Sequence, residues 1–216
     1  MRPSADIGEL EQAPSSRNGH ARIGELVRRG EVVELRRHVA DNRAAFIHWY
    51  QDPEIAEVLR HDLEPLTEHQ ARVYFDTIVM PQSSRGTCWA LHMVASGMLV
   101  GSTAVTDIDP REGTCLFRIV IGDKSIWGNG LGTEATRLVI AEAFETMDLR
   151  KVNLEVFTHN ERAQRAYLRV GFRETGRHIE WVALHQREIT VIEMSLDRAA
   201  WADHLASQNA EAELGD

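Results

Sequence analysis

The 216-residue sequence has only two cysteines, Cys88 and Cys115, and no excess of basic residues. Two cysteines without a CxxC spacing exclude a disulfide framework and make a zinc knuckle a poor interpretation. With 24 Lys and Arg against 33 Asp and Glu, the formal net charge is −9, which argues against a general nucleic-acid binder. We therefore expect no nucleic-acid partner, and the acidic balance mildly favours a cationic substrate.

Long apolar runs are also lacking. No run reaches the length that crosses a bilayer, so we expect no membrane partner. The opening MRPSADIGELEQAPSSRNGH has no apolar core and is not typical of a signal peptide. These absences predict a soluble protein in a reducing, cytoplasmic setting. The ten histidines form no HxxxH-like pair on one helical face, so we expect no metal site.

The residues that are present suit one ordinary domain. Hydrophobic residues make up 43% of the chain, enough for a substantial core. Residues 1–20 are polar, with Pro, Ser, Asn and Gly, and predict a mobile tail. Residues 21–198 are expected to form a single domain, and residues 199–216 a polar C-terminal helix or tail.

The first part of the domain predicts a strand and then helices. A strand is expected over 31–39, where β-branched residues and leucine stand among charges. Helices should lie on both sides of Asp52-Pro53, because proline cannot continue a helix. A third helix is expected over 66–80, with Thr67 as its N-cap. Its apolar side would consist of Val73, Phe75, Ile78 and Val79.

The second part changes period. Three strands over 88–95, 98–108 and 114–122, joined by short turns, predict an antiparallel meander. Further along, the sequence predicts a helix over 133–147, a strand over 150–157, a helix over 160–170 that Gly171 ends, and two strands around 184–187. This order predicts an α+β fold with a mixed, mostly antiparallel sheet of about six to seven strands and flanking helices.

The stretch SIWGNGLGTEA, residues 125–135, places three glycines directly before a predicted helix. Bare backbone lets a ligand approach, and the first-turn N–H groups and the helix dipole favour anions. A P-loop is excluded because its lysine is missing, and a dinucleotide fingerprint is excluded because the turn follows an antiparallel meander. A coenzyme A pyrophosphate site and a plain tight helix entry both remain open.

A second motif, NERAQRAYLRVGF at 160–172, follows the next strand. Together the glycine stretch and this Asn-x-x-Ala-x-x-x-Tyr-x-x-x-Gly-Phe run resemble the GNAT superfamily of N-acetyltransferases, and the expected element order matches it from about residue 30 to 196. WGNGLGTEA, and the opening at 31–59 with its Trp-x-x-Asp-Pro pattern, resemble the ribosomal-protein-alanine N-acetyltransferase branch and its spermidine-acetyltransferase cousins.

The resemblance implies a GNAT fold with a splayed central strand pair and acetyl-CoA as co-substrate. The backbone of one segment would wrap the pyrophosphate: Trp127, Gly128, Asn129, Gly130, Leu131, Gly132 and Thr133. Ile119 and Ile121 would pair their backbone with the pantetheine amides. Asn160 would bond the pantetheine or hold the splayed backbone, and Ala163 would leave room for the coenzyme chain.

Tyr167 would be the catalytic residue, because the resemblance points its hydroxyl at the coenzyme sulfur. A leaving thiolate, with a pKa of about 8.5, can be protonated by a tyrosine of pKa about 10. The alternative is a tyrosine that packs the short helix on the sheet. Neither cysteine lies in a nucleophile motif, so we expect direct attack in a ternary complex without an acyl-enzyme.

The general base is not predicted by the resemblance. The family's usual glutamate position is Leu116 here, and Arg118 follows in place of a small residue. A chain of waters could also take the proton of an α-amine, whose pKa is about 8. Five side chains are alternative candidates: His61, His92, Asp107, Asp109 and Glu180.

The acceptor would be a primary amine, either a protein N-terminal α-amine or a small amine, with polyamines and amine-bearing antibiotics as alternatives. The segment 54–69, with Asp62, Glu64 and Glu68, could form the acceptor wall. Trp49 and Tyr50 could line the same cleft or pack in the core. The missing glutamate also permits a non-catalytic acetyl-CoA sensor. A homodimer is possible, with an interface strand over 181–194.

Overall fold

The computed structural model describes residues 22–214, and the predicted tail over 1–20 lies outside them. Eight strands form one sheet in the order β1-β2-β3-β4-β5-β6-β8-β7. The strands are β1 (Leu26–Arg29), β2 (Val33–Arg36), β3 (Cys88–Met93), β4 (Leu99–Asp109), β5 (Thr114–Ile121), β6 (Lys151–Phe157), β7 (Arg173–Val182) and β8 (Arg187–Asp197). All neighbouring strands are antiparallel except β5 and β6.

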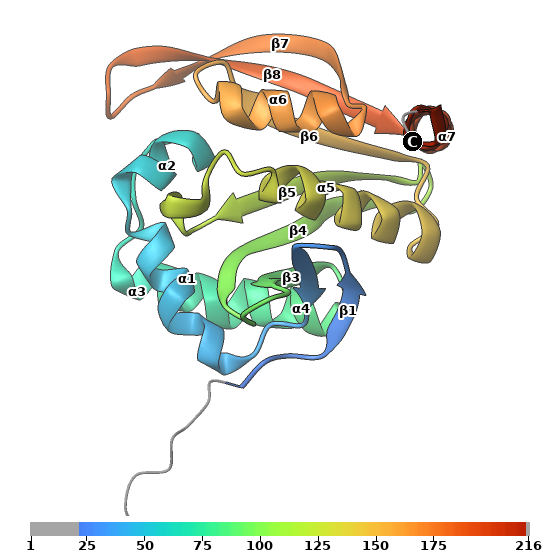
Figure 1. Cartoon of the computed structure of the whole chain (residues 1–216). Coiled ribbons are helices and arrows are strands. Elements are labelled where there is room, and N and C mark those ends of the chain that lie inside the picture. The colour runs from blue at the N-terminus through green and yellow to red at the C-terminus, as the bar shows by residue number, and fades with distance from the viewer. Residues whose placement is uncertain (1–21, 215–216) are drawn as a thin grey trace, which may run out of the picture.

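Helices flank this sheet on both faces (Figure 1). They are α1 (Arg43–Tyr50), α2 (Pro53–Leu59), α3 (Glu68–Tyr74), α4 (Met80–Arg85), α5 (Leu131–Ala141), α6 (Glu161–Val170) and α7 (Arg198–Leu214). A wider helical turn, Phe75–Val79, joins α3 to α4, and a similar turn, Glu142–Thr146, extends α5. This arrangement confirms the predicted α+β class and the mixed sheet.

The parallel pair β5 and β6 diverges. The two strands pair only from Thr114–Lys151 to Leu116–Asn153, although β5 continues to Ile121 and β6 to Phe157. Figure 1 shows the two halves of the sheet close together at the paired end and separated beyond it. The predicted splayed central pair is therefore present, and it leaves one edge of β5 without a strand partner.

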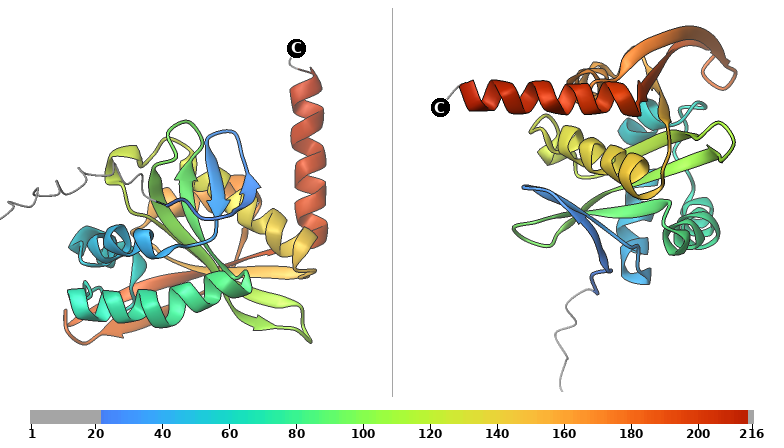
Figure 2. Two further views of the ribbon diagram at one scale, coloured as in Figure 1. Left: turned by 90° about the horizontal axis from the view of Figure 1, so that it is seen from below. Right: turned by 90° about the vertical axis from the view of Figure 1, so that its right-hand side faces the viewer.

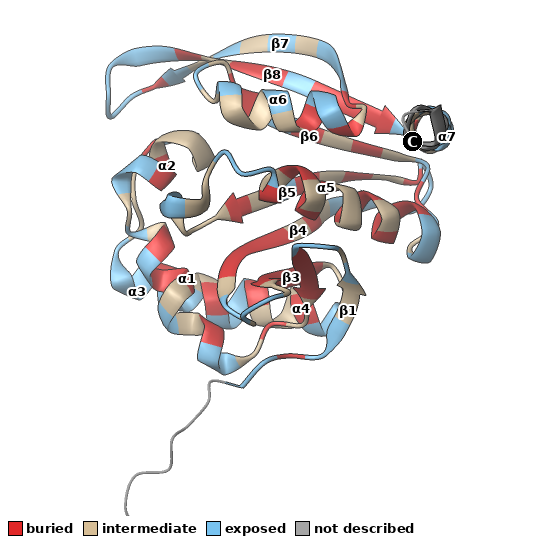
Figure 3. Cartoon of the chain, in the orientation of Figure 1, coloured by how far each residue is buried: buried red, intermediate tan, exposed pale blue. Residues whose placement is uncertain are grey.

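Two apolar clusters fix the helices to the sheet. The larger one packs α5, α6 and the start of α7 against one face, where Val139, Val170 and Trp201 are buried. On the opposite face Phe46 of α1 and Phe75 pack on Cys88 of β3. Figure 3 shows that buried residues concentrate where the helices meet the strands. Both faces of the sheet are therefore covered by helices.

The sequence undercounted the strands by one or two. Strand β1 pairs with β2 as a hairpin, but its four residues, LVRR, have an exposed leucine and no alternation of apolar residues. Short edge strands of this kind carry little hydrophobic signal, because one of their sides faces solvent. The strand expected over 31–39 is also shorter and covers only β2.

The apolar side predicted for the helix over 66–80 is half wrong. Phe75 and Val79 are buried, but Val73 and Ile78 are 43% and 39% exposed. The buried positions are Ala71, Phe75 and Val79, which recur every fourth residue. Residues at this spacing lie above one another on a helix, and Val73 is two positions off that line.

Local capping agrees with the sequence. The Asp52 carboxylate accepts hydrogen bonds from the backbone N–H groups of Glu54 and Ile55, so α2 begins at Pro53 as expected. Thr67 caps α3: its hydroxyl oxygen accepts from the Gln70 backbone N–H, and its own N–H donates to the Gln70 side-chain oxygen. Helix α7 extends from the body, as Figure 2 shows. Of the helices that the structure describes, none is both long and apolar enough to cross a membrane.

Candidate functional site

A cleft of about 280 Å³ lies at the divergence of β5 and β6. Residues of α2, β5, the glycine turn, α5, β6 and α6 line it. Eleven of the twelve site residues expected from the sequence are among them: Ile119, Ile121, Trp127, Gly128, Gly130, Leu131, Gly132, Thr133, Asn160, Ala163 and Tyr167. Asn129 belongs to the same turn but is exposed and does not line the cleft. The fold thus gathers two distant motifs at one place.

The free edge of β5 presents backbone groups to this cleft. The carbonyls of Leu116 and Arg118 accept hydrogen bonds from threonine hydroxyls of β4, at 3.4 and 2.8 Å. Successive peptide groups point to opposite sides of a strand, so the groups of Phe117, Ile119 and Ile121 point away from β4. The Ile121 carbonyl already accepts a 2.8 Å hydrogen bond from the indole N–H of Trp127. The N–H group of Ile121 and the N–H and carbonyl groups of Ile119 remain available to pair with an extended ligand.

The glycine turn opens α5 in a left-handed backbone conformation. Gly128 and Gly130 have φ values of +86° and +82°, a region that side-chain-bearing residues rarely adopt. A Cβ atom at Gly128, Gly130 or Gly132 would meet no protein atom within 4 Å. The space beside the start of α5 is therefore open to a ligand, and a helix N-terminus is a favourable place for an anion.

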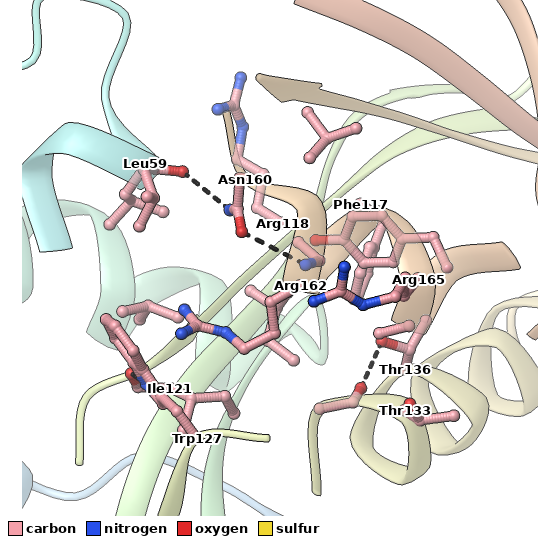
Figure 4. A pocket seen from close by; sticks show the side chains of 18 of the residues that line it. Leu59, Phe117, Arg118, Ile121, Trp127, Thr133, Thr136, Asn160, Arg162 and Arg165 are labelled. Carbon is pink, nitrogen blue, oxygen red and sulfur yellow. Dashed lines mark hydrogen bonds between the residues drawn. The ribbon is translucent and has the colours of Figure 1, made fainter. Parts of the chain in front are cut away.

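Helix α6 adds positive charge to the cleft. Arg162, Arg165 and Arg169 line it from one side of the helix, although the whole chain has a net charge of −9. The Arg162 guanidinium lies 3.6 Å from the centre of the Trp127 ring, and Figure 4 shows it reaching over the indole. Burial lowers the pKa of Arg162 from its ordinary value. The glycine turn and these arginines together form an electropositive end of the cleft.

Asn160 serves first as a helix cap. Its side-chain oxygen accepts a 3.2 Å hydrogen bond from the Ala163 N–H at the start of α6, and its amide nitrogen lies 3.5 Å from the Val58 carbonyl of α2 (Figure 4). The residue therefore ties α6 to α2 across the cleft. The resemblance implied that Asn160 bonds the pantetheine or holds the splayed backbone, and it did not predict this capping role.

Tyr167 is buried beside the splay. Its ring meets Phe117 of β5 edge-on, with 6.1 Å between ring centres. Only 8% of the residue is exposed, yet it lines the cleft. Burial raises the pKa of Tyr167 well above its ordinary value, although the nearby Arg162 opposes this. The hydroxyl therefore keeps its proton at neutral pH.

Neither cysteine is placed for nucleophilic attack. Cys88 and Cys115 are both buried and neither lines the cleft. Burial raises the pKa of each thiol to about 12, so the reactive thiolate is scarce at neutral pH.

The candidate bases differ in whether they line the cleft. Asp107 and Asp109 are exposed near the end of β4, and the Asp109 carboxylate accepts from the backbone of the following turn. His92 is buried and its ring bonds the Gly97 carbonyl. None of the three lines the cleft, whereas His61 does, and His61 is hydrogen-bonded to Glu180 at 2.7 Å. Leu116 lies in the cleft lining, at the last paired position of β5.

Residues 33–173 match the acetyltransferase (GNAT) domain family. The chain belongs to this family. It is 28% identical over 98 residues to an uncharacterised N-acetyltransferase, YoaA, of Bacillus subtilis, a match that covers 44% of this chain and about half (53%) of that protein. It is 27% identical over 140 residues to the spermidine N(1)-acetyltransferase of Escherichia coli K12, which covers 64% of this chain and 67% of that protein.

Solved acetyltransferase structures share the fold. The spermidine N-acetyltransferase of Vibrio cholerae, crystallised in complex with CoA and spermine, superposes with a TM-score of 0.68 at 17% identity, over 79% of this chain and 98% of that one. At this identity the likeness extends to the fold. The ribosomal-protein-alanine branch suggested by the sequence is not distinguished by these relatives.

The segment 54–69, expected as a possible acceptor wall, lines the cleft through Ile55, Val58, Leu59 and His61, but its carboxylates point to other partners. Asp62 pairs with Arg60 at 2.5 Å, Glu64 with His185 at 2.9 Å, and Glu68 with Arg72 at 2.6 Å. None of these carboxylates lines the cleft. Trp49 is buried, and the Tyr50 ring stacks on Phe46, so both pack in the interior.

Glu155 is the carboxylate that the sequence analysis missed. It is exposed on β6, lines the cleft, and its carboxylate lies 3.5 Å from the His61 ring. The available signal was its position in the strand KVNLEVF, where a single exposed glutamate alternates with buried residues. Within residues 22–214 no group of His, Cys, Asp and Glu side chains is arranged to hold a metal ion.

Proposed function

We propose that this GNAT-family chain is an acetyl-CoA-dependent N-acetyltransferase that transfers the acetyl group to a primary amine by direct attack in a ternary complex. The observation that carries the proposal is the free edge of β5, which leads from the splay into the glycine turn of α5. An extended ligand with two amides and a diphosphate suits this path. Its amides can pair with the free peptide groups of β5, and its diphosphate can accept from N–H donors at the start of α5.

Under this proposal the coenzyme supplies the activated acyl group, and the protein holds it. The turn from Trp127 to Thr133 would hold the diphosphate, with Arg165 and Arg169 nearby. The backbone of Ile119 would hold the pantetheine arm. Tyr167 would give its proton to the departing sulfur, and a peptide N–H of β5 would stabilise the oxyanion. The buried cysteines support transfer without an acyl-enzyme.

The acceptor is proposed as a small amine or a protein N-terminal α-amine. Relatives named as spermidine acetyltransferases support a small polyamine, and Glu155 in the cleft supports a cationic group. Amine-bearing antibiotics remain an alternative of the same chemistry.

A non-catalytic acetyl-CoA sensor is the second candidate. The observation that favours it is Leu116, which leaves the cleft without a carboxylate at the family's usual position on β5. A sensor would bind the coenzyme but would not turn over with any amine.

Two measurements test these candidates. Calorimetric titration with acetyl-CoA tests the coenzyme site, and absence of binding at millimolar concentration would reject both. Release of coenzyme A thiol is then followed with spermidine, aminoglycosides, free amino acids and short peptides that begin with Ala, Ser or Met, with a blank that lacks amine. Multiple turnovers with one class identify an enzyme and its acceptor, whereas binding without turnover across the panel favours the sensor.

A further inference from the structure

The loop between α2 and α3 is anchored by one unusual residue. Leu63 is only 3% exposed and packs with Phe157 of β6 and with residues of β7 and β8. Its φ value is +58°, a left-handed conformation that is unfavourable for a leucine. Burial in the apolar cluster compensates for this cost. The loop is therefore held firmly against the acceptor side of the sheet, and His61 lies two residues before the anchor.

His61 is fixed between two strands on the far side of the splay. Its Nδ1 lies 2.7 Å from the Glu180 carboxylate of β7, and its ring meets Phe157 edge-on at 5.3 Å. An ionised carboxylate only accepts hydrogen bonds, so Nδ1 is the donor. The neutral ring then carries its free lone pair on Nε2.

That lone pair faces another acceptor. Nε2 lies 3.5 Å from the Glu155 carboxylate of β6, and both residues line the cleft. With a neutral ring, neither group can donate to the other. A group with several N–H donors and a positive charge satisfies both at once, and a primary ammonium has three N–H donors.

We propose that His61 is the general base of this acetyltransferase, that Glu155 binds the acceptor's ammonium group beside it, and that Glu180 is the positioning residue that holds the imidazole. This inference rests on the proposed function. It places the base on the α2–α3 loop and across the splay, opposite the β5 position where Leu116 stands.

The ammonium gives one proton to His61 Nε2 and becomes a neutral amine. The nitrogen lone pair forms the C–N bond to the acyl carbon, and the C–S bond breaks with its electron pair on sulfur. Sulfur takes a proton from Tyr167, and the amide nitrogen loses its second proton, which restores Tyr167 through solvent. His61 releases its proton to solvent, so one proton leaves per turnover.

Other charged groups surround His61. His178 lies behind Glu180. Its Nε2 lies 2.9 Å from the second carboxylate oxygen of Glu180, and its Nδ1 lies 3.0 Å from the Glu193 carboxylate. Burial alone would raise the pKa of Glu180, but hydrogen bonds from His61 and His178 lower it overall, so the carboxylate stays ionised. Arg118 of β5 lines the same cleft, Arg60 and Asp62 pair with each other on the loop, and His159 stacks on Phe157.

The test compares His61→Gln with His69→Gln, an exposed histidine on α3 outside the cleft. Initial rates are measured with acetyl-CoA and spermidine, or with the peptide Ala-Ala-Ala if only that turns over, from about pH 6 to about pH 9. We expect His61→Gln to lower kcat/KM about 100-fold at neutral pH and to abolish the acid limb of the profile. Affinity for acetyl-CoA should be unchanged, and His69→Gln should behave as wild type.

Glu180→Gln tests positioning. We expect a loss of about tenfold and an acid limb that moves to lower pH, because a neutral amide stabilises the imidazolium less. A purely structural role would lower the rate without moving the limb. Glu155→Gln should raise KM for spermidine more than it lowers kcat.

The remaining outcomes contradict either the base assignment or the proposed enzyme function. If wild type turns over and His61→Gln keeps its rate and pH profile, the base assignment is wrong and the acetyltransferase proposal stands. If wild type binds acetyl-CoA but transfers to no amine, the proposed enzyme function fails and the base assignment fails with it.

Discussion

Gly130 and Gly132 stand two residues apart but meet different constraints. Gly130 adopts a positive φ directly before α5, whereas Gly132 lies inside the first turn of that helix. Neither is crowded by protein atoms. A side chain at Gly130 therefore strains the backbone, and one at Gly132 only fills the space above the turn.

This difference gives a paired prediction. Gly130→Ala should lower the free energy of unfolding by roughly 1 kcal/mol, because alanine is disfavoured at positive φ. Gly132→Ala should keep or raise stability by up to about 1 kcal/mol, since alanine is the better helix former. Both should weaken acetyl-CoA binding if the turn holds a diphosphate. Urea unfolding and calorimetry measure the two effects, and unchanged affinity in Gly132→Ala would contradict the proposed site.

Tyr167 allows a test of proton donation apart from binding. Tyr167→Phe removes the hydroxyl and keeps the ring contact with Phe117. We expect turnover to fall about 10- to 100-fold, with acetyl-CoA affinity within about twofold of wild type. Steady-state rates and calorimetry on the same preparation check this. Equal rates would assign Tyr167 to packing, the alternative that the sequence left open.

At the scale of elements, the site depends on a helix that carries charge against the protein's overall sign. The arginines of α6 recur at three- and four-residue spacings and line the cleft together. Asn160 caps the same helix and contacts α2. One element therefore links the arginine-lined part of the cleft to α2.

We predict that replacing Arg165 and Arg169 together by Gln weakens acetyl-CoA binding about tenfold and reduces its dependence on salt. Both side chains are exposed, so dissolved ions screen their attraction for phosphate. Without these two charges, the affinity for acetyl-CoA should change less between low and high salt. Arg85→Gln, an exposed arginine at the end of α4, is the matched control. Calorimetry at low and high salt would contradict the prediction if the double variant kept the wild-type salt dependence.

At the scale of the whole molecule, stability should depend on pH through a buried histidine. His38 is 5% exposed and burial lowers its pKa from 6.5 to about 4. Its neutral form is favoured in the folded state, so the unfolded chain binds more protons between these two values. Stability from this group is present above pH 6.5 and is lost as the pH falls through that window.

The expected loss from His38 is about 3 kcal/mol between pH 6.5 and pH 4. His178 opposes it: its hydrogen bond to Glu180 raises its pKa, so its contribution is present at low pH and lost as pH rises. Urea unfolding across this range should give a flatter dependence in His38→Gln than in wild type or in His48→Gln, which changes an exposed residue. Equal slopes in all three would contradict the prediction.

Much of the fold followed from local patterns in the sequence. The meander, the two motif helices, the helix break at Asp52-Pro53 and the helix ends at Thr67 and Gly171 depend on turn chemistry and hydrophobic period, which act over a few residues. The edge strand β1 did not follow, because four residues with little apolar alternation pair only when β2 is beside them.

The sequence by itself determined one end of the candidate site, where we propose that the coenzyme binds, because the glycine turn and the Asn160–Phe172 motif are each continuous segments with their own spacing. Only the tertiary structure decided the other end, where we propose that the acceptor binds. His61, Glu155 and Glu180 come from a loop and two strands that are far apart in the chain. Their meeting depends on how Leu63 seats its loop and on where β5 and β6 part, and no local pattern encodes either distance.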